Sequence, residues 1–156
     1  MPAPIYLMYS VKNIYINHRR YLNSYSNDQL KGKAISAEQA QKECAPFVYN
    51  KDIPYNYSYT GQPLDPNDIA SPCGLKPLSF FNDSFKLYRD GENISIQRKG
   101  VYNGTAINTN RGPSSERNQW IDVEDEHFKL HMLDGSLMTK KRVWGIIRND
   151  LKAGNY

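Results

Sequence analysis

A proline-rich stretch between residues 44 and 77 constrains the fold of this 156-residue chain more than any other feature. Its prolines are Pro46, Pro54, Pro63, Pro66, Pro72 and Pro77. Proline removes a backbone N–H donor and fixes φ, so neither a long helix nor a central strand can run through the stretch. The sequence therefore predicts a long irregular excursion, and an excursion of that length needs a staple or a function.

Two cysteines, Cys44 and Cys73, bracket most of the excursion. Their spacing alone does not say whether they pair, and no Cys-x-x-Cys motif or nearby histidine in the sequence indicates a zinc site. A disulfide between them would close most of the excursion and contribute about 3–4 kcal/mol on the chain-entropy estimate.

Short runs with a period of two predict that strands dominate the rest of the chain. Residues 5–9 form an apolar and aromatic run that is typical of a strand. Residues 84–89 and 94–98 alternate in polarity and flank Asp90-Gly91, which predicts a β-hairpin. Residues 127–133 also alternate, with their apolar side chains on one face, and predict a further strand.

Other segments carry apolar residues at spacings of three and four, which predicts two or three short helices. They are residues 13–25 with Asn13 as the cap, 31–43 with Ser36 as the cap, and 137–149. Residues 100–118 are rich in Gly, Asn and Ser and predict a second loop. We expect a single, mostly β domain over residues 1–156 that includes the 44–82 excursion.

The composition indicates a thin, aromatic core in a soluble chain. Only 39% of the residues are apolar, but the 12 tyrosines can bury large areas while they keep a polar end in water. No stretch approaches the ~20 apolar residues of a membrane helix, and the start does not resemble a signal peptide. The net charge of +4 is small and its signs are interleaved, so nucleic-acid binding is not indicated.

The chain contains four Asn-x-Ser/Thr sequons, which are the acceptor sites for N-linked glycans. Their asparagines are Asn56, Asn82, Asn93 and Asn103. All four lie in turn-rich sequence after the first cysteine, which fits a lumenal domain with paired cysteines. The alternative is that an asparagine-rich chain carries sequons by chance.

No pattern indicates a metal site, a cofactor or catalysis. His127 and His131 are four residues apart, and on the predicted strand they would stand ~13 Å apart, too far to share one metal ion. A loop of adjacent acids is expected to face solvent, and no Gly-x-Ser-x-Gly motif is present. These acids are Asp122, Glu124, Asp125 and Glu126. We expect no enzyme, although a secreted hydrolase that uses these acids and histidines is an alternative.

A dense polar cluster lies on the first predicted helix, at Asn17, His18, Arg19, Arg20 and Tyr21. The helical spacing points Arg19 and Arg20 outward and turns His18 and Tyr21 inward. We expect an internal network that ties this helix to the sheet, since a buried arginine is costly unless it is paired.

Several blocks, in order, resemble the accessory β-subunits of type-IV P-type ATPases, the cell-division-control-protein-50 or ligand-effect-modulator family. The opening resembles the family's strand followed by Asn-Phe-Tyr-Gln-Asn-His-Arg-Arg-Tyr. The blocks are Ile5-Tyr-Leu-Met-Tyr-Ser-Val-Lys-Asn-Ile-Tyr-Ile-Asn-His-Arg-Arg-Tyr21, Ser24 through Gly32, Cys44-Ala-Pro46, Pro72-Cys73-Gly74-Leu75, Ser79-Phe-Phe-Asn82-Asp-Ser84-Phe85, Trp120-Ile121 and Glu126-His127-Phe128.

The resemblance implies an antiparallel β-sandwich with a loop-rich subdomain on the exoplasmic side of the endoplasmic reticulum, Golgi or plasma membrane. It implies a disulfide between Cys44 and Cys73 and a recurrent glycan at Asn82. It also implies a subunit without an active site, which binds a phospholipid-flippase ATPase, escorts it from the endoplasmic reticulum and supports lipid translocation.

Compared with the family pattern, the chain lacks both membrane helices and a strand expected after residue 156. The stretch from Met132 to Trp144 also differs from the family's docking segment. We therefore expect the excursion to carry the contact with the partner, through Tyr49, Tyr55, Tyr57 and Tyr59. Two alternatives remain: these tyrosines pack on their own domain, or the chain is a soluble lumenal glycan-binding sandwich.

Overall fold

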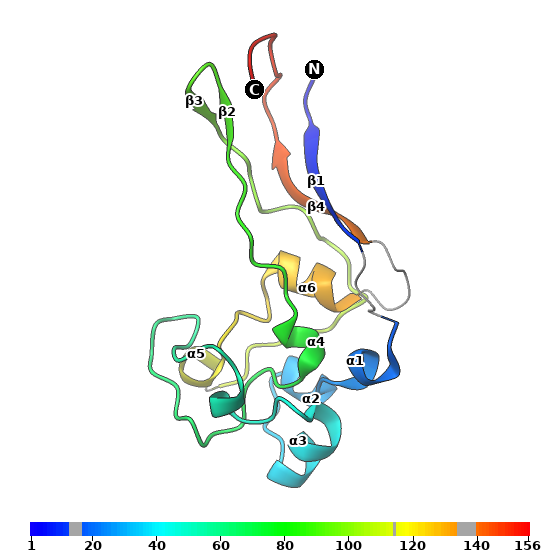
Figure 1. The fold of residues 1–156 in the computed structure, drawn as a ribbon, viewed down its shortest axis with the longest axis vertical. Coiled ribbons are helices and arrows are strands. Elements are labelled where there is room, and N and C mark those ends of the chain that lie inside the picture. Colours follow the sequence, from blue (N-terminus) through cyan, green and yellow to red (C-terminus); the bar gives the residue numbers. More distant parts are fainter. Residues whose placement is uncertain (13–16, 114, 134–139) are drawn as a thin grey trace.

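The molecule is elongated, with a β ribbon at one end and a cluster of short helices and loops at the other (Figure 1). The computed structural model describes residues 1–12, 17–113, 115–133 and 140–156. Both termini lie at the ribbon end, and α6 lies between the ribbon and the cluster. The elements are β1 (Ile5–Val11), α1 (Arg19–Asn23), α2 (Asn27–Leu30), α3 (Ala37–Cys44), the 3₁₀ helix η1 (Asn50–Asp52), α4 (Leu75–Leu78), β2 (Leu87–Arg89), β3 (Glu92–Ile94), α5 (Ser115–Asn118), α6 (Glu126–Leu133) and β4 (Lys140–Ile147).

The ribbon joins the two ends of the chain. β1 pairs with β4 in antiparallel register from Ile5 opposite Ile147, with one irregularity after Leu7. On the other edge of β4, Gln97 and Ile146 exchange two backbone hydrogen bonds of 2.9 and 2.8 Å. This bridge attaches the segment that follows the β2–β3 hairpin, so three stretches of chain lie side by side in the ribbon.

The helix termini follow local capping chemistry. The Ser36 hydroxyl accepts a hydrogen bond from the Gln39 amide at the start of α3. The Asp125 carboxylate accepts from the amides of His127 and Phe128 at the start of α6, at 2.9 and 3.0 Å. Each cap satisfies amides that the first turn of a helix leaves without a backbone partner.

Two buried clusters form the core of the helical half. The larger one surrounds the cysteines and contains Ala40, Cys44, Val48, Ile53, Leu64, Ala70, Cys73 and Trp120. The smaller one contains Leu30, Val123, Phe128 and Met132. Ile121 packs against both clusters, so the segment between α5 and α6 holds them together.

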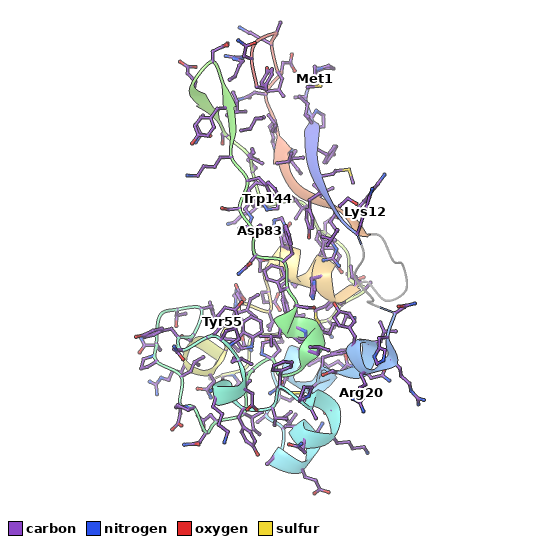
Figure 2. The ribbon with its side chains drawn as sticks, in the orientation of Figure 1. Met1, Lys12, Arg20, Tyr55, Asp83 and Trp144 are labelled. Atoms are coloured by element: carbon purple, nitrogen blue, oxygen red, sulfur yellow. A yellow bond between two sulfur atoms is a disulfide. The ribbon has the colours of Figure 1, made fainter. Side chains whose placement is uncertain are left out.

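Aromatic rings connect the helical half to the ribbon. Tyr9 of β1 stacks on Phe81 with ring centroids 4.4 Å apart, and Phe85 meets the Trp144 ring of β4 edge-on at 5.2 Å. The Trp144 indole N–H donates to the Asp83 carbonyl oxygen at 3.1 Å. Figure 2 shows Asp83 and Trp144 close together at the junction between the halves. The chain just after α4 therefore anchors the ribbon.

The prediction of antiparallel strands is confirmed for two small sheets, β1–β4 and β2–β3. The predicted strand over residues 5–9 is confirmed, and so is a hairpin with Asp90 and Gly91 at positive φ in its turn. The second hairpin strand is β3, Glu92–Ile94, and not the predicted 94–98. Strands do not dominate the described residues, because the helices hold more of them. The described residues show no sandwich.

Two segment predictions were wrong. Residues 127–133 belong to α6 and are not a strand, and residues 140–147 form β4 where we expected the helix of 137–149. The predicted helix over 13–25 is shorter in the described part, and α2 begins at Asn27, just after its expected end. Residues 13–16, with the proposed cap Asn13, and residues 137–139 lie outside the described residues. Among the described residues, no helix has the length and apolarity that a membrane crossing requires.

Candidate functional site: the disulfide-closed excursion

A disulfide between Cys44 and Cys73 closes the excursion, with Cα atoms 5.5 Å apart. Both cysteines are fully buried in the larger cluster. Cys44 is the last residue of α3, and Cys73 lies just before α4. The bond therefore fixes the two ends of the loop region to helical segments on either side.

Gln29 of α2 ties the closing end of the excursion to the helices. Its side-chain N–H donates to the Ala70 carbonyl at 2.9 Å, and its side-chain oxygen accepts from the Cys73 amide at 2.8 Å. The Gln29 amide group thus pairs with this backbone as a neighbouring strand would. Its donor and its acceptor are both hydrogen-bonded in a buried position.

Ser24 holds both cysteine-bearing segments. Its hydroxyl donates to the Cys44 carbonyl at 3.2 Å and accepts from the Leu75 amide at 2.9 Å. Gly74 passes so close to the Ser24 backbone, at φ +104°, that a Cβ atom there would collide with the Ser24 carbonyl oxygen. Only glycine tolerates both the positive φ and the close approach.

Trp120, which follows α5 in the sequence, packs against the excursion. Its indole N–H donates to the Pro72 carbonyl at 2.8 Å, and its ring stacks on Tyr55 with centroids 4.6 Å apart and planes 8° from parallel. The Trp120 amide also donates to the Ser71 carbonyl at 3.1 Å. One tryptophan therefore links the two halves of the excursion, near Tyr55 and near Cys73.

Short local hydrogen bonds order the middle of the excursion. The Asp52 carboxylate accepts from the amides of Val48 and Tyr49, at 3.2 and 2.8 Å. The Asn50 side chain donates to the Asp65 carbonyl at 2.8 Å. These bonds give the proline-rich backbone the partners that a regular element would otherwise supply.

The four tyrosines proposed for partner contact do not share one environment. Tyr49, Tyr55 and Tyr59 are half-buried, and the first two pack against the larger cluster. Tyr57 is 63% exposed. The structure thus leaves Tyr57 as the most accessible of the four, and contact with a partner remains a prediction for all of them.

The polar cluster on α1 differs from the expectation. Of its five residues, only Tyr21 is buried, and its hydroxyl lies 2.9 Å from the Ser79 hydroxyl at the end of α4. Arg19 and Arg20 point outward as predicted. The inward orientation of His18 was wrong, because His18 is exposed and caps α1 by accepting from the Arg20 amide. The described contacts tie α1 to α4.

The four sequon asparagines are exposed, which is the environment that a glycan requires. Asn82 lies at the junction between the halves, beside Phe81. Asn93 lies in the hairpin strand β3, and Asn56 and Asn103 lie in loops. Their occupancy remains a prediction.

The acidic cluster has structural partners, so the expectation that it faces solvent was wrong. Glu126 accepts from the amides of Val101 and Tyr102 at 2.8 and 3.0 Å, and Asp122 pairs with Arg111 at 2.6 Å. Burial alone would raise the pKa of Asp122, but the hydrogen bond from Arg111 and that from a backbone amide hold it below its usual value. Burial would also raise the pKa of Glu126, but hydrogen bonds from backbone amides lower it below its usual value.

The two histidines are buried on α6 and do not form a polar strand face. A ring nitrogen of His127 bonds to the Arg98 carbonyl at 3.1 Å, and one of His131 bonds to the Lys76 carbonyl at 2.7 Å. The described residues contain no group of three or more acidic, cysteine or histidine side chains placed to hold a metal ion. His127 joins α6 to the segment at Arg98, and His131 joins α6 to α4.

Acidification from pH 7.5 to 5.5 is expected to destabilise the fold through His127. Burial lowers the pKa of His127, and the neighbouring Arg98 charge lowers it further. The unfolded chain then binds a proton near pH 6.5 that the folded chain does not, so stability falls as the pH drops through that value. The slope is at most about 1.4 kcal/mol per pH unit. Thermal melting across this range measures it.

His127→Gln should flatten this pH dependence, whereas His18→Gln, at an exposed histidine, should leave it unchanged. Equal slopes in wild type and His127→Gln would show that other groups cause the acid sensitivity.

Known proteins resemble this chain over its whole length. Residues 1–156 match the model of the LEM3 (ligand-effect modulator 3) family / CDC50 family. "Putative ALA-interacting subunit 4" of Arabidopsis thaliana is 28% identical over 99% of this chain and 46% of its own length. "Cell cycle control protein 50A" of Mus musculus is 33% identical over 62% of this chain and 24% of its own length.

"Phospholipid-transporting ATPase accessory subunit LEM3" of Saccharomyces cerevisiae is 32% identical over 65% of this chain and 23% of its own length. The chain spans less than half the length of the curated relatives that it matches. Gln29, Ser24 and Trp120 lie in blocks that carry the family resemblance, but the sequence reasoning assigned them no role in holding the excursion. Gln29 and Ser24 have no sequence pattern of their own that reveals the loop they support.

Proposed function

This chain belongs to the LEM3/CDC50 family, and from that premise we propose that it is a non-catalytic ectodomain of a phospholipid-transporting ATPase's accessory subunit. In this role it binds exoplasmic loops of the ATPase and supports the folding of the ATPase, its exit from the endoplasmic reticulum and lipid translocation. The observation that carries the proposal is the family match over the entire chain. The printed names of two relatives, an ALA-interacting subunit and an ATPase accessory subunit, support it.

Three features of the chain support a lumenal, binding role. The disulfide is of the kind that persists in oxidising compartments. The sequon asparagines are exposed and can accept glycans. The buried histidines and the acids bond to backbone groups and cations, which are structural duties. The specific compartment is part of the proposal.

The excursion is the surface that we propose for contact with the ATPase, with Tyr57 as the first anchor. A stapled and hydrogen-bonded loop loses little conformational freedom on binding, so more of its contact energy contributes to affinity. The same proposal includes a single domain over residues 1–156. It also includes an antiparallel sandwich, in which β4 is an inner strand.

Co-expression tests this function. The tagged chain and a phospholipid-transporting ATPase are produced together in a eukaryotic secretory pathway, and the ATPase captured on the tag is quantified. We expect capture well above that by an unrelated disulfide-containing lumenal protein of similar size. Near-UV circular dichroism of the captured chain confirms that it is folded.

A different outcome would favour glycan binding. A cavity of about 410 Å3 lies beside the excursion, and its lining residues include Tyr49, Asn67 and Asn118. Aromatic and amide groups of this kind are suited to sugars. Retention of the folded chain on immobilised glycans, together with no capture of any ATPase, would replace the proposed function.

A further inference from the structure

Charge is unevenly distributed along the sequence. Residues 1–27 and 135–149 together contain seven lysine and arginine residues and no aspartate or glutamate. The rest of the chain holds thirteen basic and sixteen acidic residues, so it is net negative while the whole chain is +4. Two segments that are far apart in sequence therefore carry the entire positive excess.

The fold brings these two segments together. β1 comes from the first and β4 from the second, and Ser10 lies opposite Lys141 in their register. Lys12 directly follows Val11, the last residue of β1, so it lies at the same end of the ribbon as Lys141. Arg19 and Arg20 follow on α1, and Figure 2 shows Lys12 and Arg20 on the same side of the molecule.

Four exposed basic side chains lie on this side, at the end of the ribbon and on α1, and are called the basic surface here: Lys12, Arg19, Arg20 and Lys141. None of them has an ion pair with a described residue. The ion pairs in the described part of the chain lie elsewhere, at Lys33–Asp28, Arg111–Asp122 and Lys129–Glu124. Three cations outside the basic surface have acidic partners among the described residues, whereas the four cations of the surface have none there.

Exposed apolar side chains continue the same face of the ribbon. Tyr6 and Met8 of β1 are 55% and 54% exposed, and they lie on the same face of the strand as Ser10. Aromatic residues, methionine and arginine are the residue types enriched in protein interfaces. A polypeptide satisfies both parts of the face, because one segment can supply carboxylates at one end and apolar contacts at the other.

We propose that the basic surface binds an acidic segment of the partner polypeptide, with the adjacent Tyr6 and Met8 as its apolar border. This inference rests on the proposed function, since the partner is then an exoplasmic loop of the ATPase. The two arginines can hold carboxylates in a bidentate manner, which lysine cannot. The contact is separate from the part of the excursion around Tyr55, because Figure 2 shows Tyr55 and Arg20 on opposite sides of the helical half.

Charge reversal tests the inference. In the capture assay, Arg19→Glu/Arg20→Glu is compared with Lys99→Glu/Lys152→Glu, which changes the net charge equally at two exposed lysines outside the surface. We expect about a tenfold or greater loss of captured ATPase for the arginine variant and wild-type capture for the lysine variant. Wild-type capture should also decrease as salt rises from 0.05 to 0.5 M, because salt screens exposed charges (~3 Å Debye length near 1 M).

Arg19→Lys/Arg20→Lys keeps the charge and removes the bidentate geometry, so its capture should be intermediate. All variants should melt like wild type, because the exchanged side chains are exposed. Equal capture by wild type and the Arg→Glu variant would overturn the inference and leave the proposed function standing. No capture by wild type would remove the proposed function, and the inference with it.

A membrane surface is the competing use of four clustered cations. Sedimentation with vesicles of phosphatidylcholine and about 30% phosphatidylserine measures membrane binding. This composition approximates the anionic content of a physiological membrane. Vesicle binding that is lost in the Arg→Glu variant, with unchanged capture of the ATPase, would assign the surface to lipid and overturn the proposal.

Discussion

Replacing Cys44 and Cys73 together by serine is expected to lower the free energy of unfolding by about 3–4 kcal/mol. The two cysteines are 29 residues apart in sequence, and their bond restricts the unfolded chain by closing that loop. Six prolines and few regular elements make the excursion depend on this bond and on side-chain hydrogen bonds. Urea unfolding of the folded chain, followed by fluorescence, measures the loss.

Wild type under reducing conditions should behave like the double variant, which serves as the internal control. The interaction with the ATPase should weaken in parallel if the excursion carries the contact. A double variant with wild-type stability would mean that Gln29, Ser24 and Trp120 hold the excursion without the covalent bond. Retained capture in a destabilised variant would place the interface elsewhere.

Trp120→Ala is expected to cost about 3–5 kcal/mol, the range for removing a buried aromatic side chain. The side chain is 6% exposed, stacks on Tyr55 and donates a hydrogen bond to the Pro72 carbonyl. Its removal leaves a void between the halves of the excursion and an unpaired carbonyl. Urea unfolding measures the cost, and Trp144, the other tryptophan, reports it from the ribbon.

Two variants separate the causes. Trp120→Phe keeps most of the ring and loses the hydrogen bond, so its cost should be well below that of Trp120→Ala. Tyr57→Ala removes an exposed aromatic residue of the same excursion and should change stability by about 0.5 kcal/mol or less. A loss for Tyr57→Ala as large as that for Trp120→Ala would contradict this account of the packing.

Sequence patterns predicted the elements whose signals are local. The Ser36 cap and the Asp90-Gly91 turn depend on nearby residues, and the structure confirms both. Residues 127–133 show why a short pattern fails. Phe128, Leu130 and Met132 alternate, but the buried set His127, Phe128, His131 and Met132 follows a helical face. Seven residues fit both periods, and the cap supplied by Asp125 favours the helix.

β4 shows the opposite failure. Its apolar residues fit helical spacing, yet Val143, Ile146 and Ile147 are β-branched and find strand partners in β1 and at Gln97. Those partners are far away in sequence, so no local window contains the information. The same limit applies to the excursion, where Gln29 and Ser24 act on segments more than forty residues away.

The pairing of β1 with β4 also orders events during synthesis. A chain that emerges N-terminus first presents Ile5–Val11 long before Lys140–Ile147, so β1 must wait until more than a hundred further residues have been made. The excursion can close over 29 residues well before that point. Long-range pairing is slow to form. During the wait, the Ile-Tyr-Leu-Met-Tyr run of β1 is an exposed apolar segment, and it is the part of the nascent domain that a holding chaperone would recognise first.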